Sequence, residues 1–172
     1  EFRRVLFRSE GAGSFKLSAP PVYSKAPAVP AIAYSPNGAL LAAAGYHETL
    51  LHAADGSKIL ARLLGESPRI ESIAFAPNSK WLATAGGAPS RFGEIQIWAL
   101  SSNTLVRSIK VSHDSLFGVS FSPESDRIAV GGADKSVRVF ALTNGQEILK
   151  FDNHSDWVFA TTFTVNGDRK ST

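Results

Sequence analysis

Four histidines are the first residues in this sequence that could do chemistry, because a neutral imidazole is a common ligand for transition metals. They are His47, His52, His113 and His154. No two of them stand four residues apart, none lies in a cluster with carboxylates, and the chain has no cysteine. The sequence therefore predicts no metal site and no other cofactor.

Ser112, His113 and Asp114 supply the residue types of a hydrolytic triad. Neighbours in sequence do not form one, because the nucleophile, the base and the orienting carboxylate must come from separate elements. The chain also lacks a Gly-x-Ser-x-Gly motif, and its double glycines at 86–87 and 131–132 open no helix, as a phosphate loop would. We therefore predict that the protein is not an enzyme.

The first nine residues resemble the translation of a sequencing-library adapter, with a short basic targeting segment as the alternative. Residues 10–28 follow as a lead-in rich in proline and glycine. The first nine contain three arginines and one glutamate, so +2 of the total charge of +3 belongs to them and +1 remains. The basic excess typical of a nucleic-acid-binding surface then disappears. No apolar run is long enough to span a bilayer, so we predict neither nucleic acid nor membrane as a partner.

An internal repeat organises the rest of the chain. Four segments share an alternating apolar run followed by a turn, and three of them have a proline at the same point. The prolines are Pro36, Pro77 and Pro123, with Val165 in the fourth segment, so the intervals are 41, 46 and 42 residues. A period of about 40–45 residues is typical of propeller blades made of four short strands.

Alternation of apolar residues, as in Ile73-Ala74-Phe75, predicts strands, and no window has the spacing of an amphipathic helix. We predict an all-β fold, a partial β-propeller of four-stranded antiparallel blades, with about three complete blades and a truncated fourth. The predicted blades cover residues 29–65, 66–111, 112–152 and 153–172. Their strands are expected at 30–35, 39–44, 48–53 and 58–64; at 70–75, 80–85, 94–99 and 104–109; at 116–121, 127–131, 136–141 and 147–151; and at 157–163.

These repeats resemble those of the WD-repeat family. The Trp of its Trp-Asp dipeptide matches Trp98 and Phe140, the His of its Gly-His dipeptide matches His113 and His154, and its turn aspartate matches Asp134. The resemblance implies a buried hydrogen-bonded set of His, Asp, a hydroxyl residue and Trp inside each blade. Only the third blade has both His113 and Asp134, and Phe140 has no N–H to donate. The blades are therefore expected to be held mainly by apolar packing.

The resemblance also implies where partners bind. The repeat alignment gives one equivalent position in each blade that faces the top surface near the central channel in this family. Its residues are Ala28, Arg69, Ser115 and Trp157. Trp157 is a candidate hot spot, because a large buried ring contributes much of an interface's energy; the alternative is that it packs between blades. Arg91 and Phe92, on an extended loop, form a second candidate patch for partner binding.

Three functions fit these features. The first, which we predict, is a non-catalytic scaffold that binds a protein or peptide partner through its top-face loops. The second is the accessory propeller of an exported bacterial haem protein, which a Cys-x-x-Cys-His motif upstream would mark. The third is a propeller enzyme, which usually has His, Glu or Arg at matching blade positions, unlike the aligned set above. The compartment stays open between cytoplasm and periplasm, with an exported bacterial protein favoured.

A partial ring has a physical consequence. A blade buries its faces only against neighbouring blades, and rings need at least about four of them. The missing blades of the same parent chain are therefore expected partners, and without them the apolar faces should be open. We expect this chain alone to aggregate or to be only marginally stable.

Overall fold

The computed structural model describes residues 28–164 and 169–171. Within these ranges the chain forms thirteen strands and no helix, which confirms the all-β prediction. The segment 1–9, nearly all of the lead-in 10–28 and the fourth repeat's Val165 lie outside the described residues.

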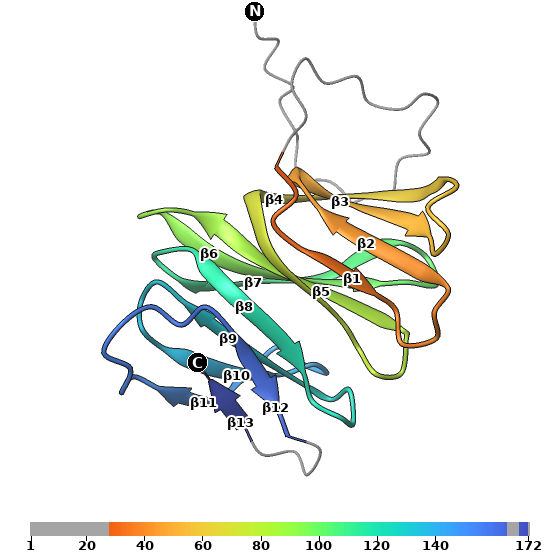
Figure 1. Ribbon diagram of the computed structural model, residues 1–172. Helices are drawn as coiled ribbons and strands as arrows, with labels where there is room; N and C mark the ends of the chain where they lie inside the picture. Colours follow the sequence, from red (N-terminus) through yellow and green to blue (C-terminus); the bar gives the residue numbers. More distant parts are fainter. Residues whose placement is uncertain (1–27, 165–168, 172) are drawn as a thin grey trace, which may run out of the picture.

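The first seven strands form one antiparallel sheet in sequence order (Figure 1). They are β1 Ile32–Tyr34, β2 Leu40–Ala44, β3 Tyr46–Ala53, β4 Ile59–Phe75, β5 Trp81–Ala88, β6 Phe92–Ala99 and β7 Thr104–Ser112. The first part of β4 pairs with β3 and completes blade 1, whereas its last part pairs with β5 and begins blade 2. Two of the predicted blades therefore share one sheet.

The strand β4 differs from the sequence prediction, which placed two strands at 58–64 and 70–75. It runs unbroken for 17 residues. Its middle, residues 65–68, lies at a register shift where the ladders with β3 and β5 pair none of the four residues. Gly65 and Pro68 therefore cost no ladder hydrogen bond there, and the backbone stays extended.

The third blade is a separate four-stranded sheet in the order β11-β10-β9-β8. Its strands are β8 Leu116–Phe121, β9 Arg127–Gly132, β10 Val137–Ala141 and β11 Glu147–Phe151, close to the predicted ranges. The start of a fourth blade is a pair, β12 Thr161–Phe163 and β13 Arg169–Ser171. Its first strand is shorter than the predicted 157–163, because residues 157–160 pack against blade 3 without ladder pairing.

The repeated prolines begin the turn between the first two strands of each blade. Each turn ends with a residue at positive φ: 70° at Gly38, 54° at Ser79 and 60° at Ser125. Proline fixes φ at the start of such a turn and glycine tolerates the positive φ. The two serines also accept a hydrogen bond from the turn of the preceding blade, Asn37 N–H to Ser79 Oγ over 3.3 Å and Asn78 N–H to Ser125 Oγ over 3.2 Å.

The apolar cores lie between blades. Ile73 and Phe75 of β4 are buried in the core between blades 1 and 2, and Val119 and Phe121 of β8 in the core between blades 2 and 3. Blades 2 and 3 lie in separate sheets, so the apolar cluster between them holds these two blades side by side. A side-chain bond assists, since the Val119 N–H donates to Ser72 Oγ over 3.3 Å.

Blade 1 has one open apolar face. Ile32 and Tyr34 of β1 hold the same repeat positions as Ile73 and Phe75, which are each 9% exposed, yet they are 67% and 60% exposed themselves. The repeat makes these positions inter-blade contacts, and no described residue of another blade covers β1 from this side. The face therefore has the composition of a blade interface.

Replacing Ile32 and Tyr34 together by lysine is expected to increase the soluble monomeric fraction several-fold, because charges break up an exposed apolar patch. Size-exclusion chromatography with light scattering at fixed loading concentration measures this fraction. Lysine at Leu60 and Ile148, which are 45% and 48% exposed on peripheral strands, is the matched control. An equal gain in the control would show that general charge, rather than this face, sets solubility.

Candidate interaction surface

The partner-binding residues predicted from the sequence come from loops at one end of the strands, which we call the top face. It consists of the turns between second and third strands and of the connections that lead into the next blade. Loops of both kinds contact each other across blade boundaries. The Ser90 N–H donates to Asp114 Oδ1 over 3.1 Å, and Lys135 Nζ donates to the Ser155 carbonyl over 2.9 Å. The top face is thus continuous from blade 2 to the start of blade 4.

Three aromatic rings lie together where blade 3 meets the start of blade 4, two of them exposed and the third, Phe117, half-buried, and we call them the aromatic cluster. Trp157 is 51% exposed and Phe159 is 60% exposed. The ring of Phe117, in β8, has its centroid 5.6 Å from that of Trp157 and 5.2 Å from that of Phe159. Trp157 is thus exposed and also contacts Phe117 of blade 3.

Val158 fixes the orientation of this cluster. Its side chain is 1% exposed and its N–H donates to the Gly132 carbonyl over 3.1 Å. A Cβ at Gly131 would lie 2.4 Å from Val158 Cγ1, so the glycine is needed for this approach. Side chains of an extended segment alternate in direction, and burying Val158 therefore turns Trp157 and Phe159 outward together.

Phe117 and Phe159 are missing from the sequence prediction, although the repeat carries a signal for them. The alignment that equates Ser115 with Trp157 also equates Phe117 with Phe159 two residues later. Two aromatic rings at one repeat position in neighbouring blades indicate that they lie side by side. That inference needs only the period and the alternation of a strand.

Arg69 and Ser115 are placed differently from Trp157. Arg69 is exposed, and its Nη2 lies 3.0 Å from Glu71 Oε1. Ser115 is only 5% exposed, so its prediction as a partner-binding surface residue is wrong. Its N–H donates to Asp114 Oδ1 and its carbonyl accepts the Ala133 N–H, which hold it against blade 3.

Arg91 and Phe92 belong to blade 2 and form a patch apart from the aromatic cluster. Arg91 is exposed and Phe92 is half-buried. Lys110 Nζ lies 4.8 Å from the centre of the Phe92 ring and 2.9 Å from Glu66 Oε1. One face of the Phe92 ring is therefore already occupied by a cation, which leaves less apolar surface for a partner.

The repeat residues matched to the family's tryptophan are buried, Trp98 at 3% exposure and Phe140 at 4%. The buried Trp98 Nε1–H has no hydrogen-bond partner. The indole therefore acts as an apolar packing group in the core between blades 1 and 2, in the way that Phe140 does between blades 2 and 3.

The hydrogen-bonded set that the resemblance implied for the third blade has a different composition. His113 is exposed, so its predicted role inside the blade is wrong, and His154 is half-buried. Asp134 instead accepts hydrogen bonds from Arg138 Nη1 over 2.6 Å and from the Ser136 N–H over 3.2 Å. The arginine is on the strand next to the turn, so a local ion pair takes the place of the contact to His113.

Blade 2 contains a buried polar network that the sequence did not predict. Glu94 is 1% exposed. Its Oε2 accepts hydrogen bonds from Ser67 Oγ over 2.5 Å and from Gln96 Nε2 over 2.8 Å, and its Oε1 accepts one from Ser108 Oγ over 2.5 Å. Ser67 is in the middle of β4, so the network fastens the segment shared by blades 1 and 2. Apolar packing, which was predicted to be the main contribution, is therefore supplemented here by buried hydrogen bonds.

Blade 1 has a related buried carboxylate. Glu48 holds the same ladder position as Glu94 and pairs with Arg62, which holds the position of Ser108.

Within residues 28–164 and 169–171, no three His, Cys, Asp or Glu side chains gather as metal ligands. In the same ranges no helix is long and apolar enough to cross a bilayer.

Comparison with known sequences identifies the repeats. The family model described as WD domain, G-beta repeat matches residues 57–88 and 103–140. The first match includes most of β4 and all of β5, and the second extends from β7 into β10. Each match therefore crosses from one blade into the next.

Two curated relatives resemble parts of the chain. Protein groucho of Drosophila melanogaster is 30% identical over 76 residues, which cover 44% of this chain and 10% of that protein. WD repeat-containing protein 90 of Homo sapiens is 30% identical over 84 residues, which cover 45% of this chain and 5% of that protein. The chain thus spans a tenth or less of the length of these relatives.

Two solved structures have the same fold, one titled "Crystal structure of RRP9 WD40 repeats" and the other "Structure of U3-55K". Each superposes with a TM-score of 0.71 at 17% identity and covers 81% of this chain and 43% of the solved chain. Proteins with WD40 repeats are generally protein-interaction scaffolds and typically non-catalytic. The repeats at residues 57–88 and 103–140 belong to the WD-repeat family, and the sheets of the chain are blades of a partial β-propeller.

Proposed function

We propose that this chain is a non-catalytic scaffold that binds a protein or peptide partner on its top face, with the aromatic cluster as the main contact. The observation that carries the proposal is the exposure of Trp157 and Phe159 beside Phe117. Large aromatic side chains supply much of the binding energy in protein interfaces. Three rings that already contact each other also lose little conformational freedom on binding.

The surroundings of the cluster support a peptide partner with an apolar anchor. Asp156 Oδ1 accepts the Trp157 N–H over 2.8 Å, and Lys135 holds the Ser155 carbonyl. These polar groups fix the backbone of the segment and provide a polar rim around an apolar centre, as in most protein interfaces. The Arg69–Glu71 pair on blade 2 offers a further polar contact for a partner that extends along the top face.

Replacing Trp157 and Phe159 together by serine is expected to weaken binding of peptides selected on the wild-type chain by about 30-fold, the effect of losing one strong hot spot of about 2 kcal/mol. The peptides come from a random displayed library, and fluorescence polarisation gives their dissociation constants. Retained affinity in the double variant would refute the proposal.

The matched control replaces Ile148 and Phe151 by serine. These residues are 48% and 39% exposed on the peripheral strand β11, so the number and type of lost apolar groups are similar. We expect the control to bind the selected peptides like the wild type. Equal weakening in the control would assign the loss to a general effect on the fold.

A further inference from the structure

A pocket of about 330 Å³ lies between blades 2 and 3 at the opposite end of the strands from the top face, and we call it the inter-blade pocket. Ligand pockets in proteins have about 300–1,000 Å³, so this one has room for one side chain and its backbone. Blade 2 supplies one wall and blade 3 the other. The lining residues are Trp81, Ile97, Val106 and Arg107, and Ser125, Asp126, Leu142 and Thr143.

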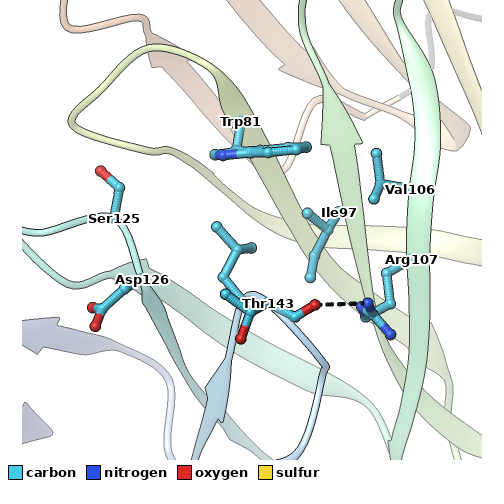
Figure 2. Close-up of a pocket in the computed structure, with 8 residues that line it drawn as sticks. Trp81, Ile97, Val106, Arg107, Ser125, Asp126 and Thr143 are labelled. Atoms are coloured by element: carbon cyan, nitrogen blue, oxygen red, sulfur yellow. Dashed lines mark hydrogen bonds between the residues drawn. The ribbon is translucent and has the colours of Figure 1, made fainter.

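The walls of the pocket are apolar and its two ends carry opposite charges. Figure 2 shows Trp81 above the recess, with Arg107 on one side and Asp126 on the other. Trp81, Ile97 and Leu142 belong to the core between blades 2 and 3 or pack against it, so the pocket is the open end of that core. An apolar group bound there would extend an existing core.

Both charged groups are held in place. Arg107 Nη2 donates to the Thr143 carbonyl over 3.1 Å, across the blade boundary. Asp126 Oδ1 accepts the Ser122 hydroxyl over 2.7 Å, and this hydrogen bond keeps the pKa of Asp126 below its ordinary value of 3.8. The carboxylate is therefore ionised at neutral pH. Its Oδ2 lies 3.5 Å from Arg127 Nε, and Arg107 lies at the other end of the apolar lining.

Blade packing itself does not require this combination of residues. The interface between blades 1 and 2 has the same ladder positions and the equivalent turn-to-turn hydrogen bond, from the Asn37 N–H to Ser79 Oγ, which corresponds to the bond from the Asn78 N–H to Ser125 Oγ. There, the positions of Trp81, Arg107 and Asp126 are taken by Leu40, Ala61 and Lys80. Trp81 and the pair of opposite charges are thus features of the interface between blades 2 and 3 that the interface between blades 1 and 2 does not share.

We propose that the inter-blade pocket binds an extended peptide segment of a partner protein by one inserted apolar side chain. The Asp126 carboxylate accepts an N–H of the inserted residue, and the Arg107 guanidinium donates to its carbonyl oxygen. An amino-acid residue has this polarity, a donor and an acceptor on either side of an apolar side chain, so its chemistry complements the slot. This site is independent of the aromatic cluster and adds a second contact on the opposite face.

The three tryptophans make a direct test available. Trp81 is in the pocket, Trp98 is buried between blades 1 and 2, and Trp157 is in the aromatic cluster, so each indole N–H signal in a ¹H–¹⁵N spectrum reports one place. Titration with N-acetyl-leucinamide is expected to shift the Trp81 signal saturably, with the Trp98 and Trp157 signals unchanged. A Trp81 signal that does not move, or one that moves without saturating, overturns the proposal.

Free leucine distinguishes a peptide from a free amino acid, because its ammonium and carboxylate could pair with the same two groups. Weaker binding of free leucine than of N-acetyl-leucinamide is expected for a peptide site. Tighter binding of free leucine overturns the peptide assignment. The proposed function is tested separately, by the binding of selected peptides to the variant with serine at Trp157 and Phe159, so failure at one site does not imply failure at the other.

Two variants test the lining. Val106→Glu and Asp126→Asn are each expected to weaken binding of N-acetyl-leucinamide by at least about fivefold, the effect of losing one hydrogen bond or the equivalent apolar contact. Leu60→Glu is the matched control, since Leu60 has the position of Val106 in blade 1 and a similar exposure of 45% against 50%. An unchanged Trp98 signal shows that a variant keeps its fold. Binding that survives both pocket variants, or that falls equally in Leu60→Glu, overturns the proposal.

Discussion

Replacing Trp98 by alanine is expected to lower the free energy of unfolding by about 3–5 kcal/mol, the range found for large aromatic residues in protein cores. The indole is 3% exposed and packs in the core between blades 1 and 2. Its removal leaves a cavity that extended strands on both sides cannot easily close. Urea unfolding followed by far-ultraviolet circular dichroism gives the free energy without relying on tryptophan fluorescence.

Phenylalanine at the same position separates packing from hydrogen bonding. The Trp98 Nε1–H is buried without a partner, so Trp98→Phe removes a polar group that the core does not satisfy. We expect this variant to lie within about 1 kcal/mol of the wild type, because the lost volume is partly offset. Trp157→Ala is the exposed control, with an effect of about 1 kcal/mol or less. A similar loss at both tryptophans would contradict the role given to Trp98.

Replacing Glu94 by alanine is expected to cost about 3–5 kcal/mol, as for other groups removed from a buried charged network. Ser67 and Gln96 would each retain a buried donor that has lost its acceptor, and such a donor costs about 1–3 kcal/mol, whereas the exposed Ser108 hydroxyl can bond to water. Glu94→Gln keeps the size and one carbonyl oxygen, so its cost should be about half as large. The same urea titration measures both variants.

Glu66→Ala is the control for Glu94. Glu66 pairs with Lys110 at 2.9 Å, but its side chain is 61% exposed. Exposed ion pairs contribute about 0–1 kcal/mol, so this variant should unfold near the wild-type midpoint. If Glu94→Ala were as stable as Glu66→Ala, the network would have no net stabilising effect.

The strand positions could be read from the sequence because two local signals coincide. The alternation in Ile73-Ala74-Phe75 indicates a strand with one face in a core, and each repeated proline shows where such a strand ends. Both signals act over a few residues and do not depend on distant contacts. Because the sequence repeats, the strand positions inferred in one blade apply at the equivalent positions of the next. The predicted ranges therefore agree with the strands of blade 3.

The continuity of β4 was not predictable from such signals. Gly65 and Pro68 normally interrupt a strand. Here they fall at a register shift, where neither ladder uses their backbone. Whether a proline meets a paired or an unpaired position depends on the neighbouring strand, and that information is not local.

The candidate site was predictable in part. Trp157 could be singled out because a large ring stood at a repeat position occupied elsewhere by Arg69 and Ser115. The burial of Ser115 could not be read in this way, since a small polar residue is common both at surfaces and under loops. The contact between Ser67 and Glu94 was equally hidden, because it joins residues 27 positions apart whose types are ordinary on an exposed face.

The unbroken β4 strand has a mechanical consequence. Blades 1 and 2 have no loop between them, and the hydrogen bond from Ser67 to Glu94 fastens the unpaired stretch 65–68, so relative motion of the two blades must bend one continuous backbone and strain this buried contact. Blade 3 follows only after residues 113–115, which lie outside every strand, and side-chain packing and a few hydrogen bonds resist its rotation. Flexibility is therefore concentrated at the connection between blades 2 and 3, while blades 1 and 2 move together as one rigid unit.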